Sequence, residues 1–313
     1  MKLNNFLNIA LILLITTPVT SVSGGKTTYD FLRNDVGARA AGLGGSFVTM
    51  SDDPNAIFYN PAGLGSLSQR RVSIGFFKHL LDINSGYVSF GTDIAGLGVI
   101  GAGVNYINYG EFRRRGEEGQ DLGRFGAGEV ALSACYAGPL KNDVNYGVGV
   151  KFIHSSIAEF SSSGAALDLG IQYVAVRDRM LIGASLLNLG TQFDPYGTTR
   201  ESLPLDFKIG MSLYPEHLPA VLSVDFHKLN ERQERFTERF SLFSVGVEFT
   251  ASPNLQLRFG YNNEKRRDLK VGSSSGLAGF SAGFGLSTGM YIIDYAYTSY
   301  GQIGAVHRVS VSF

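Results

Sequence analysis

The chain has 313 residues, of which 17% are charged, 40 are glycine, 15 are tyrosine and 22 are phenylalanine. The charged fraction is below the quarter or so that is typical of soluble domains, which indicates a partly apolar surface. Equal numbers of basic and acidic residues (27 each) give no support to nucleic-acid binding, and the single Cys135 excludes a disulfide framework.

The N-terminus has the order of a secretory signal. Lys2 precedes an apolar run at residues 6–15, and small residues at 21–24 supply a cleavage region. A membrane anchor is the weaker hypothesis, because a spanning helix needs about 20 apolar residues. No cysteine follows the run to carry a lipid. We therefore predict a cleaved signal peptide over residues 1–23.

Residues 24–69 have a different pattern from the rest of the chain. The Ala-rich stretch 34–43 predicts a short helix that Asn34 or Asp35 could cap. A second short helix is predicted from Asp53 onward, because proline follows it at the first helical position. A segment this apolar is not expected to hang free in the periplasm, so we predict that it folds inside a barrel as a plug, or hatch.

From about residue 70, apolar and polar residues alternate with a period of two. In 205–213 every odd position is apolar, and 144–152 repeats the pattern. Strict alternation predicts strands with one apolar face, which occur both in soluble sandwiches and in transmembrane barrels. Fourteen strands are predicted, near 70–78, 83–91, 95–107, 125–137, 144–154, 165–176, 179–188, 203–213, 219–228, 241–250, 254–263, 277–287, 289–298 and 305–313.

The predicted connections sort by length. Short ones (92–94, about 138–140, 177–178, 214–218, 251–253 and 288) alternate with others, most of them long and polar (108–124, 189–202, 229–240 and 264–276). This sorting is typical of transmembrane barrels, whereas a sandwich has no reason for it. We therefore predict an all-β fold, a fourteen-stranded antiparallel barrel over residues 70–313. It would lie in the lipid of the cell outer membrane, and the even number of strands would place both chain termini on the tight-turn side, which is the periplasm.

The polar face of these strands would line the lumen. It carries four basic and five acidic residues: Lys151, Asp168, Asp206, Lys208, Asp225, Glu248, Arg258, Asp294 and Arg308. Near balance predicts pairing among them or docking of the hatch, and it argues against a strongly ion-selective pore. Glycines recur on the strands, which fits the close approach of a plug.

The chain stops at Phe313, at the end of an alternating strand. This strand resembles the last strand of outer-membrane proteins, whose terminal Phe is read by the barrel-assembly machinery, a partner expected during biogenesis. Aromatic residues near other strand ends predict an interfacial girdle: Phe76, Phe77, Tyr87, Phe90, Tyr106, Tyr109, Tyr295 and Tyr297.

No catalytic, metal or cofactor site is predicted, so we expect that the chain is not an enzyme. Residues 272–276 match the hydrolase motif Gly-x-Ser-x-Gly, but they fall in a predicted loop without the strand and helix that the motif needs. The five histidines lack ligand spacing. His227 and Asp225 share one strand face, which favours a lumen hydrogen bond over a metal site.

Three consecutive arginines, Arg113 to Arg115, stand out in the predicted loop 108–124. Guanidinium groups pair well with phosphate, so these residues could bind lipopolysaccharide. Because Glu117 and Glu118 follow, a solvated loop of mixed charge is the favoured interpretation.

Residues 37–45, Asp52-Asp53 and 60–64 resemble the start of the PorV/PorQ family, and 294–310 resembles its C-terminal pattern. That family belongs with the FadL-type long-chain fatty-acid transporters, so the resemblance implies a fourteen-stranded barrel. In those transporters an Asn-Pro-Ala sequence of the hatch lies against a kink in the third strand, beside a lateral opening. The matching positions are Asn60, Pro61 and Ala62 for the hatch, with Gly96, Gly98, Gly101 and Gly103 as candidates for the kink.

Two functional hypotheses follow from this resemblance. In the first, the chain is a PorV/PorQ-type component of protein export or surface attachment, as in type IX secretion, with secretion-system or exported proteins as partners. In the second, it is a FadL-like passive transporter of hydrophobic small molecules. An outer-membrane enzyme is a distant third, because no lumen set of Ser, His and an acid is visible.

Overall fold

The structure, a computed structural model, describes residues 27–231, 236–270 and 276–313. The predicted signal peptide, 1–23, lies outside them. The strands are β1 (Arg71–Lys78), β2 (Asn84–Ile94), β3 (Gly98–Arg115), β4 (Asp121–Lys141), β5 (Val144–Ile157), β6 (Phe160–Val176), β7 (Met180–Asp194), β8 (Asp206–Leu213), β9 (Ala220–Phe226), β10 (Phe243–Ser252), β11 (Leu255–Asn262), β12 (Phe280–Thr288), β13 (Tyr291–Ser299) and β14 (Ala305–Ser312).

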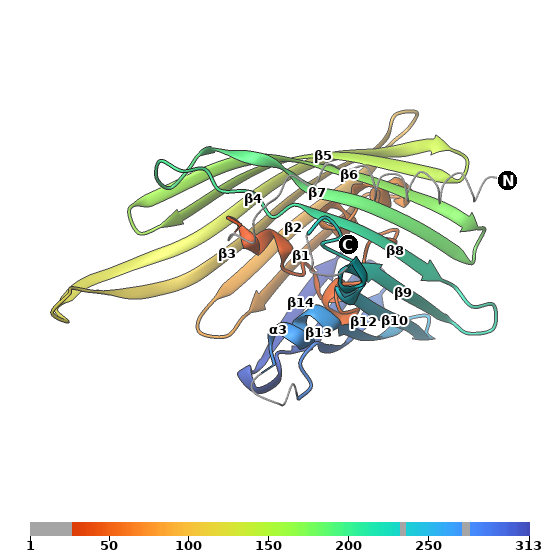
Figure 1. The fold of residues 1–313 in the computed structure, drawn as a ribbon. Coiled ribbons are helices and arrows are strands. Elements are labelled where there is room, and N and C mark those ends of the chain that lie inside the picture. The colour runs from red at the N-terminus through yellow and green to blue at the C-terminus, as the bar shows by residue number, and fades with distance from the viewer. Residues whose placement is uncertain (1–26, 232–235, 271–275) are drawn as a thin grey trace.

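The helices are short: η1 (Asp30–Arg33), α2 (Ala38–Gly42), η2 (Pro54–Phe58), η3 (Pro61–Ser66), η4 (Phe236–Ser241), α3 (Asn263–Asp268) and η5 (Gly301–Ile303). None of the helices in the described ranges is long and apolar enough to cross a membrane. The first four precede β1 and lie within the ring of strands (Figure 1).

All fourteen strands form one closed antiparallel barrel (Figure 1). Each strand pairs with its neighbours in sequence, and β1 closes the ring on β14, with Phe76 opposite Val309. Closure leaves no free edge, so every strand finds hydrogen-bond partners on both sides along most of its length. The predicted fold class is confirmed.

The connections sort by end, as predicted. At the end where β1 begins and β14 stops, the turns span 95–97, 142–143, 177–179, 214–219, 253–254 and 289–290. At the other end, called here the loop end, they span 79–83, 116–120, 158–159, 195–205, 227–242, 263–279 and 300–304. The prediction of a loop at 108–124 is wrong, because most of that stretch extends β3 and β4. Alternation ends there, since neither face of the extended hairpin packs on a core.

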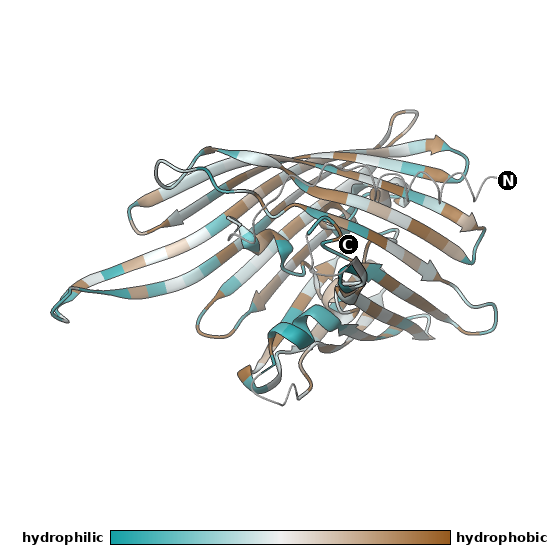
Figure 2. Cartoon of the chain, in the orientation of Figure 1, coloured by the Kyte–Doolittle hydropathy of each residue, from teal (hydrophilic) through white to brown (hydrophobic). Residues whose placement is uncertain are grey.

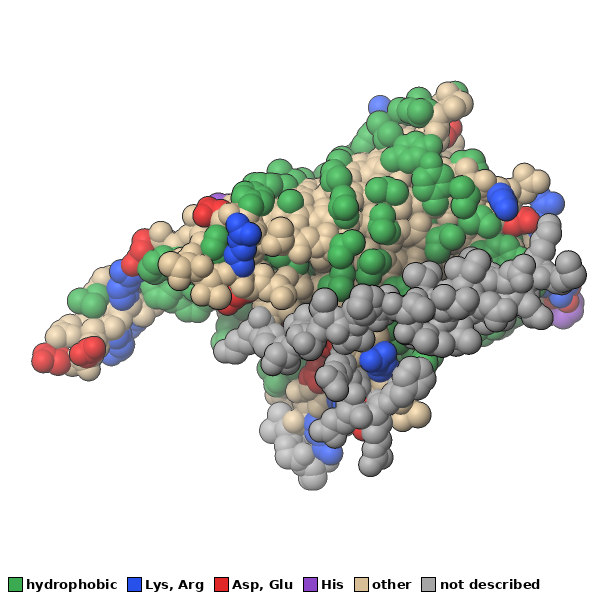
Figure 3. All heavy atoms as spheres, turned by 45° about the horizontal axis from the view of Figure 1, so that its top comes forward, with side chains coloured by type: hydrophobic (Ala, Val, Ile, Leu, Met, Phe, Trp, Pro, Cys, Tyr) green, Lys and Arg blue, Asp and Glu red, His purple; other side chains and the backbone are tan. Residues whose placement is uncertain are grey.

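The outer surface of the barrel is apolar. Outward side chains such as Phe76, Val150 and Phe259 are 59%, 56% and 59% exposed. Figure 2 shows the alternation of hydrophobic and hydrophilic positions along the strands, and Figure 3 shows hydrophobic side chains over the wall. A belt of this kind around a closed barrel is a lipid-facing surface.

Three residues assigned to the aromatic girdle face the other way: Phe77, Tyr87 and Tyr109, the last of which packs against Ile107 inside the barrel. Phe77 and Tyr87 are only 3% exposed or less and point into the lumen. Phe77 follows Phe76, so on a pleated strand the two rings must lie on opposite faces. The hydroxyl of Tyr87 lies 2.9 Å from that of Ser73 on β1 and accepts a hydrogen bond from Asn55 of the hatch.

Candidate functional site

Residues 27–69, called the hatch from here on, run through the lumen. η1 lies toward the loop end, beside Ser202 and Leu205. η3 lies against the inner faces of β4, β5 and β6, and α2 lies against β12 and β13. The first helix is shorter than predicted and follows Gly37, whereas the second is capped as predicted, with Asp53 accepting from the backbone of Asn55 at 2.9 Å.

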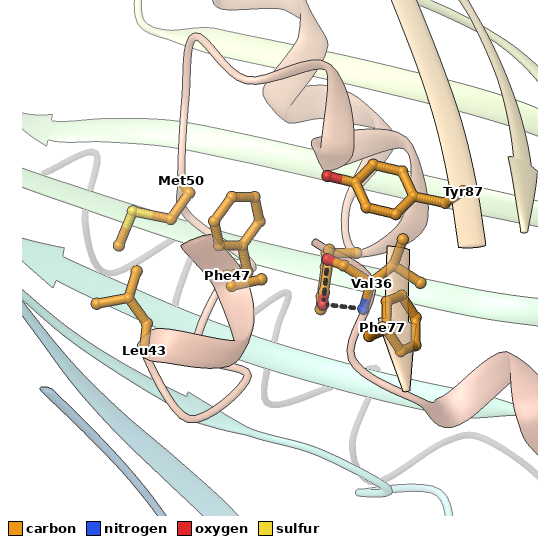
Figure 4. Packing of buried hydrophobic residues seen from close by; sticks show 8 residues of the cluster. Val36, Leu43, Phe47, Met50, Phe77 and Tyr87 are labelled. Atoms are coloured by element: carbon orange, nitrogen blue, oxygen red, sulfur yellow. Dashed lines mark hydrogen bonds between the residues drawn. The ribbon is translucent and has the colours of Figure 1, made fainter. Parts of the chain in front are cut away.

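The middle of the hatch has its own apolar cluster, which joins it to the barrel wall (Figure 4). It contains Val36, Leu43, Phe47, Met50 and Tyr59 of the hatch, together with Phe77 of β1 and Tyr87 of β2. The Tyr59 hydroxyl accepts from the amide of Val36 at 2.7 Å and donates to its carbonyl at 3.0 Å. This phenol therefore ties two distant parts of the hatch together.

Inward glycines let the hatch backbone approach the wall. A Cβ on Gly147 of β5 would overlap the Pro61 carbonyl group, and one on Gly170 of β6 would overlap the side-chain oxygen of Asn60. On the opposite side of the lumen, a Cβ on Gly260 of β11 would overlap the backbone of Gly44. Glycine is needed at these positions because any side chain would push the hatch away.

The hatch motif is buried and well bonded. Asn60 accepts from the amide of Ala62 at 3.2 Å, which caps η3. Its side-chain amide donates to the carbonyls of Val48 at 2.9 Å and Ile171 of β6 at 3.2 Å. Asn60, Pro61 and Ala62 therefore join the hatch to β5 and β6.

The third strand shows no kink. β3 pairs with β2 from Gly98 to Asn108 without a register shift, and Gly96 lies in the turn before the strand. Gly101 and Gly103 make room for Leu64 and Phe58 of the hatch. The expectation of a break in this ladder is therefore wrong, because the glycines that suggested it accommodate hatch side chains and the backbone stays paired.

A departure from regular pairing lies between β6 and β7. The register shifts between Leu167 and Leu169, opposite Asn188, whose φ is +62°. The Asp168 carboxylate accepts the Asn188 amide at 2.8 Å, and the Asn188 side chain accepts from Lys151 at 2.6 Å. Beyond Leu187, β7 no longer pairs with β8, and the loop 195–205 lies along that seam.

Eight of the nine predicted lumen charges are buried; Lys208 is partly exposed. Seven of the nine form ion pairs with one another: Lys151 with Asp168 at 3.0 Å, Arg258 with Glu248 and Asp294 at 2.6 Å each, and Lys208 with Asp206. Lys208 lies 3.4 Å from Asp206 and 5.5 Å from the Tyr59 ring centre. Arg308 donates to Thr298 at 3.1 Å and lies over the Phe77 ring.

The lumen charges also hold the hatch. Asp225 of β9 accepts the backbone amides of Phe47 and Val48 at 2.6 and 2.8 Å. Arg39 of α2 pairs with Glu248 at 2.8 Å and with Asp53 at 3.2 Å. Burial alone would lower the pKa of Arg39, but the charge and hydrogen bonds of Glu248 and the charges of Asp53 and Asp294 together outweigh it and raise the pKa well above its usual value. Arg39 therefore stays charged inside the lumen.

Two pairs that fasten the loop end had no signal in the amino-acid sequence. Lys265 of α3 pairs with Asp35 of the hatch, a residue predicted only as a helix cap. Burial acts to raise the pKa of Asp35, but the charges of Lys265, Arg308 and Lys208 and the hydrogen bond with Lys265 together outweigh it and lower this pKa. His227 lies 2.9 Å from Glu264 of α3, so the predicted hydrogen bond with Asp225 is wrong. These pairs join residues far apart in the chain, which periodicity cannot reveal.

The half of the lumen toward the loop end is lined by apolar side chains, called here the outer apolar cluster. Its members come from η1 and the inner faces of β3 to β6: Tyr29, Phe31, Ile107, Ala131, Ile153, Ala166 and Leu203. Leu203 belongs to the loop along the β7–β8 seam.

Neither a metal centre nor the hydrolase motif can be built from the described residues. In the ranges that the structure covers, no group of three His, Cys, Asp or Glu side chains is placed to hold a metal ion. Gly276 is described, but 272–275 of the motif lie outside the described residues. Cys135 is buried among Leu64, Leu67 and Val99, as a small apolar filler. Phe313 pairs through its backbone with Val72, and its predicted assembly role stays a prediction.

No protein-family model matches the chain, and no curated protein matches its sequence. Solved structures do match its fold. The toluene transporter TbuX of Ralstonia pickettii is 14% identical, with a TM-score of 0.57 over 88% of this chain and 96% of that one. The Pseudomonas putida toluene transporter TodX is 12% identical, with a TM-score of 0.58 over 89% and 97%.

A Pseudomonas aeruginosa FadL homologue is 10% identical, with a TM-score of 0.55 over 89% of this chain and 98% of that one. Identities this low show the fold alone. The shared fold, the closed ring of strands and the apolar belt agree with one another. The chain is therefore an outer-membrane β-barrel with the fourteen-stranded FadL-type fold.

Proposed function

We propose that the chain lets small hydrophobic molecules cross the outer membrane passively, and that it has no catalytic role. The observation that carries this proposal is the fold shared over 88–89% of the chain with two proteins described as toluene transporters and with a FadL homologue. The outer apolar cluster supports it, because ligand sites for hydrophobic molecules are concave and lined mainly by apolar side chains.

In this proposal a molecule enters between the loops and reaches Ile107, Ile153 and Ala166 on the inner wall. Phe31 of η1 occupies this space in the structure, so η1 would have to shift for a ligand to bind. Toward the tight turns the lumen is filled by η2 and η3, which lie close to inward glycines. Passage therefore requires either movement of the hatch or exit through the wall, for which the β7–β8 seam is a candidate, because β7 stops pairing with β8 beyond Leu187.

The test compares two tryptophan substitutions on one strand. Ala131 of β4 is 2% exposed inside the outer apolar cluster, whereas Ala134 is exposed on the lipid face. Uptake of labelled toluene and of a labelled long-chain fatty acid is measured in cells that lack other such transporters. We expect A131W to reduce uptake at least fivefold and A134W to leave it unchanged. Equal uptake with and without the wild-type protein would refute the proposal.

The second candidate function is a PorV/PorQ-type role in protein export. It rests on the motif resemblance at both ends of the chain and on the charged β3–β4 hairpin, which projects beyond the loop end (Figure 1). Deletion of 111–124, the projecting part of that hairpin, distinguishes the two candidates. Loss of surface attachment of exported proteins with unchanged uptake of hydrophobic molecules would favour export, and the reverse result would favour transport.

A further inference from the structure

The projecting part of the β3–β4 hairpin is a two-stranded ribbon with sorted faces. β2 stops pairing with β3 at Asn108, and β5 stops pairing with β4 at Ala127, so the hairpin continues without neighbours. On one face Phe112 and Phe125 stack at 5.4 Å, and the Arg114 guanidinium lies 5.7 Å from the Phe125 ring. Arg114, the middle one of the three consecutive arginines, is thereby used within the ribbon.

The other face is continuous with the lipid-facing side of the barrel. On β4, Arg124, Gly126, Gly128 and Val130 alternate with inward residues, and Arg124 donates to Glu111 of β3 at 3.1 Å. Glu111 and Arg124 therefore share this outward face, and so does Arg113, which lies directly opposite Arg124 in the ladder. Figure 3 shows the ribbon with its basic and acidic side chains beyond the hydrophobic wall.

Two arginines that face each other across a ladder repel unless an anion lies between them. Glu111 neutralises one of the two charges. Within the described part of the chain, no carboxylate forms an ion pair with Arg113. Both arginine side chains are exposed, so the pair presents an excess positive charge just outside the apolar belt.

A groove of about 580 Å³ begins at the Glu111–Gly126 rung, two positions below the two arginines, and runs toward the belt; neither arginine lines it. Its floor is Gly126, Gly128 and Val130 of β4, and its sides are outward side chains of the two neighbouring strands: Tyr106 and Asn108 of β3, His154 and Ser156 of β5. Glu111, already paired with Arg124, and Glu129 also line it. The groove thus has polar groups in its middle and apolar ones at its lower end. From Arg124 to Val130 the strand rises by about 20 Å, at 3.3 Å per residue.

This order of groups matches a phosphorylated, acylated sugar. Guanidinium groups bind phosphate through paired hydrogen bonds. Asn108, His154 and Ser156 supply hydrogen-bonding groups for a sugar, and Tyr106 and Val130 border the lipid-facing wall where acyl chains lie. We propose that this groove binds the headgroup of a phosphorylated glycolipid of the outer leaflet, with a phosphate between Arg113 and Arg124.

The test uses the full-length mature barrel in detergent, with bis-phosphorylated lipid A as the probe and native mass spectrometry as the readout. We expect R113Q/R124Q to weaken binding at least tenfold, and G128L, which fills the floor of the groove, to do the same. R113K/R124K should recover part of the affinity. Heat-modifiable mobility on gels shows that each variant still forms the barrel.

The matched control is R177Q/R200Q, which removes two exposed arginines elsewhere and should bind as the wild type does. Lipid A without its phosphates should bind wild type and R113Q/R124Q equally weakly. An equal loss of affinity in R177Q/R200Q would overturn the proposal. It would also be overturned if the wild type bound phosphate-free lipid A as tightly as it binds bis-phosphorylated lipid A. Inorganic phosphate is added at about 10 mM, which is on the order of the dissociation constant expected for a weakly bound free anion. If it displaced all of the bound lipid A, the assignment of the site to a lipid would be overturned.

Discussion

Arg39 of the hatch holds Glu248 of β10 through two parallel hydrogen bonds, from Nε to Oε2 at 2.9 Å and from Nη2 to Oε1 at 2.8 Å. The same carboxylate accepts from Arg258 of β11 at 2.6 Å. One residue of the hatch is thus built into the ion network of the wall. The hatch and the barrel therefore behave as one packed unit.

Replacing Arg39 by Met should loosen the hatch. Glu248 keeps Arg258, so the loss is that of three hydrogen bonds to charged groups, two to Glu248 and one to Asp53, about 2–3 kcal/mol in the free energy of unfolding. The measurement is a urea titration in detergent micelles, with amide exchange of 38–42 as a local readout. R39K keeps the charge without the paired geometry, so its free energy of unfolding should lie between those of the wild type and R39M. Exchange at wild-type rates in R39M would contradict this role of Arg39.

Gly170 tests the close approach of the hatch. A Cβ at this position overlaps the Asn60 side-chain oxygen, so G170A should displace η3 at a cost of about 1–3 kcal/mol. Release of the hatch opens the lumen to water, and we expect faster leakage of a small hydrophilic dye from liposomes. The control is G86A, because Gly86 has space for a Cβ on the outer face. Leakage that is the same in both variants would argue against the hatch as the barrier.

Lys151 should be the most sensitive lumen charge. Its side chain and that of Asp168 are 5% and 4% exposed, so K151M leaves a buried carboxylate without its cation and should cost about 3–5 kcal/mol. The double variant K151M/D168N removes the charge but keeps an oxygen for the Asn188 amide. We expect it to be more stable than K151M in the same urea titration. If K151M/D168N is less stable than K151M, the ion pair between Lys151 and Asp168 is not what stabilises the irregular pairing of β6 and β7.

The lowered pKa of Glu264, at the loop end, predicts that the free energy of unfolding depends on pH. Burial raises its pKa, but the contact with His227 and the charge of Lys228 outweigh this and lower the pKa from 4.5 to about 2. A group whose pKa is depressed by folding stabilises the folded state above its unfolded pKa. That contribution is lost as the pH falls from about 4.5 toward 2.

The measurement is the stability difference between wild type and E264Q in urea at pH 7, 5, 4 and 3. We expect the wild type to be more stable by a constant amount at pH 7 and 5, and the difference to shrink at pH 4 and again at pH 3. A difference that grows on acidification would show that Glu264 is not held as the charged form.

The strands and their order around the ring could be predicted from the amino-acid sequence. A period of two is a local property of the chain, and the sorting of the connections by length favoured a lipid-embedded barrel over a soluble sandwich. The near balance of lumen charges also indicated pairing, which Lys151 and Asp168 illustrate. Alternation failed only where water touches both faces, as along the ribbon that carries Arg113.

The partners of the buried polar side chains became known from the tertiary structure alone. Asn60 could not be assigned to β6, nor Asp35 to Lys265, because those partners are separated by 111 and 230 positions in the chain. The glycines of β3 illustrate the same limit. A glycine without a Cβ serves equally for a bend or for a close neighbour. In this protein Leu64 and Phe58 of the hatch pack over two of these glycines, and β3 keeps its regular pairing with β2 there.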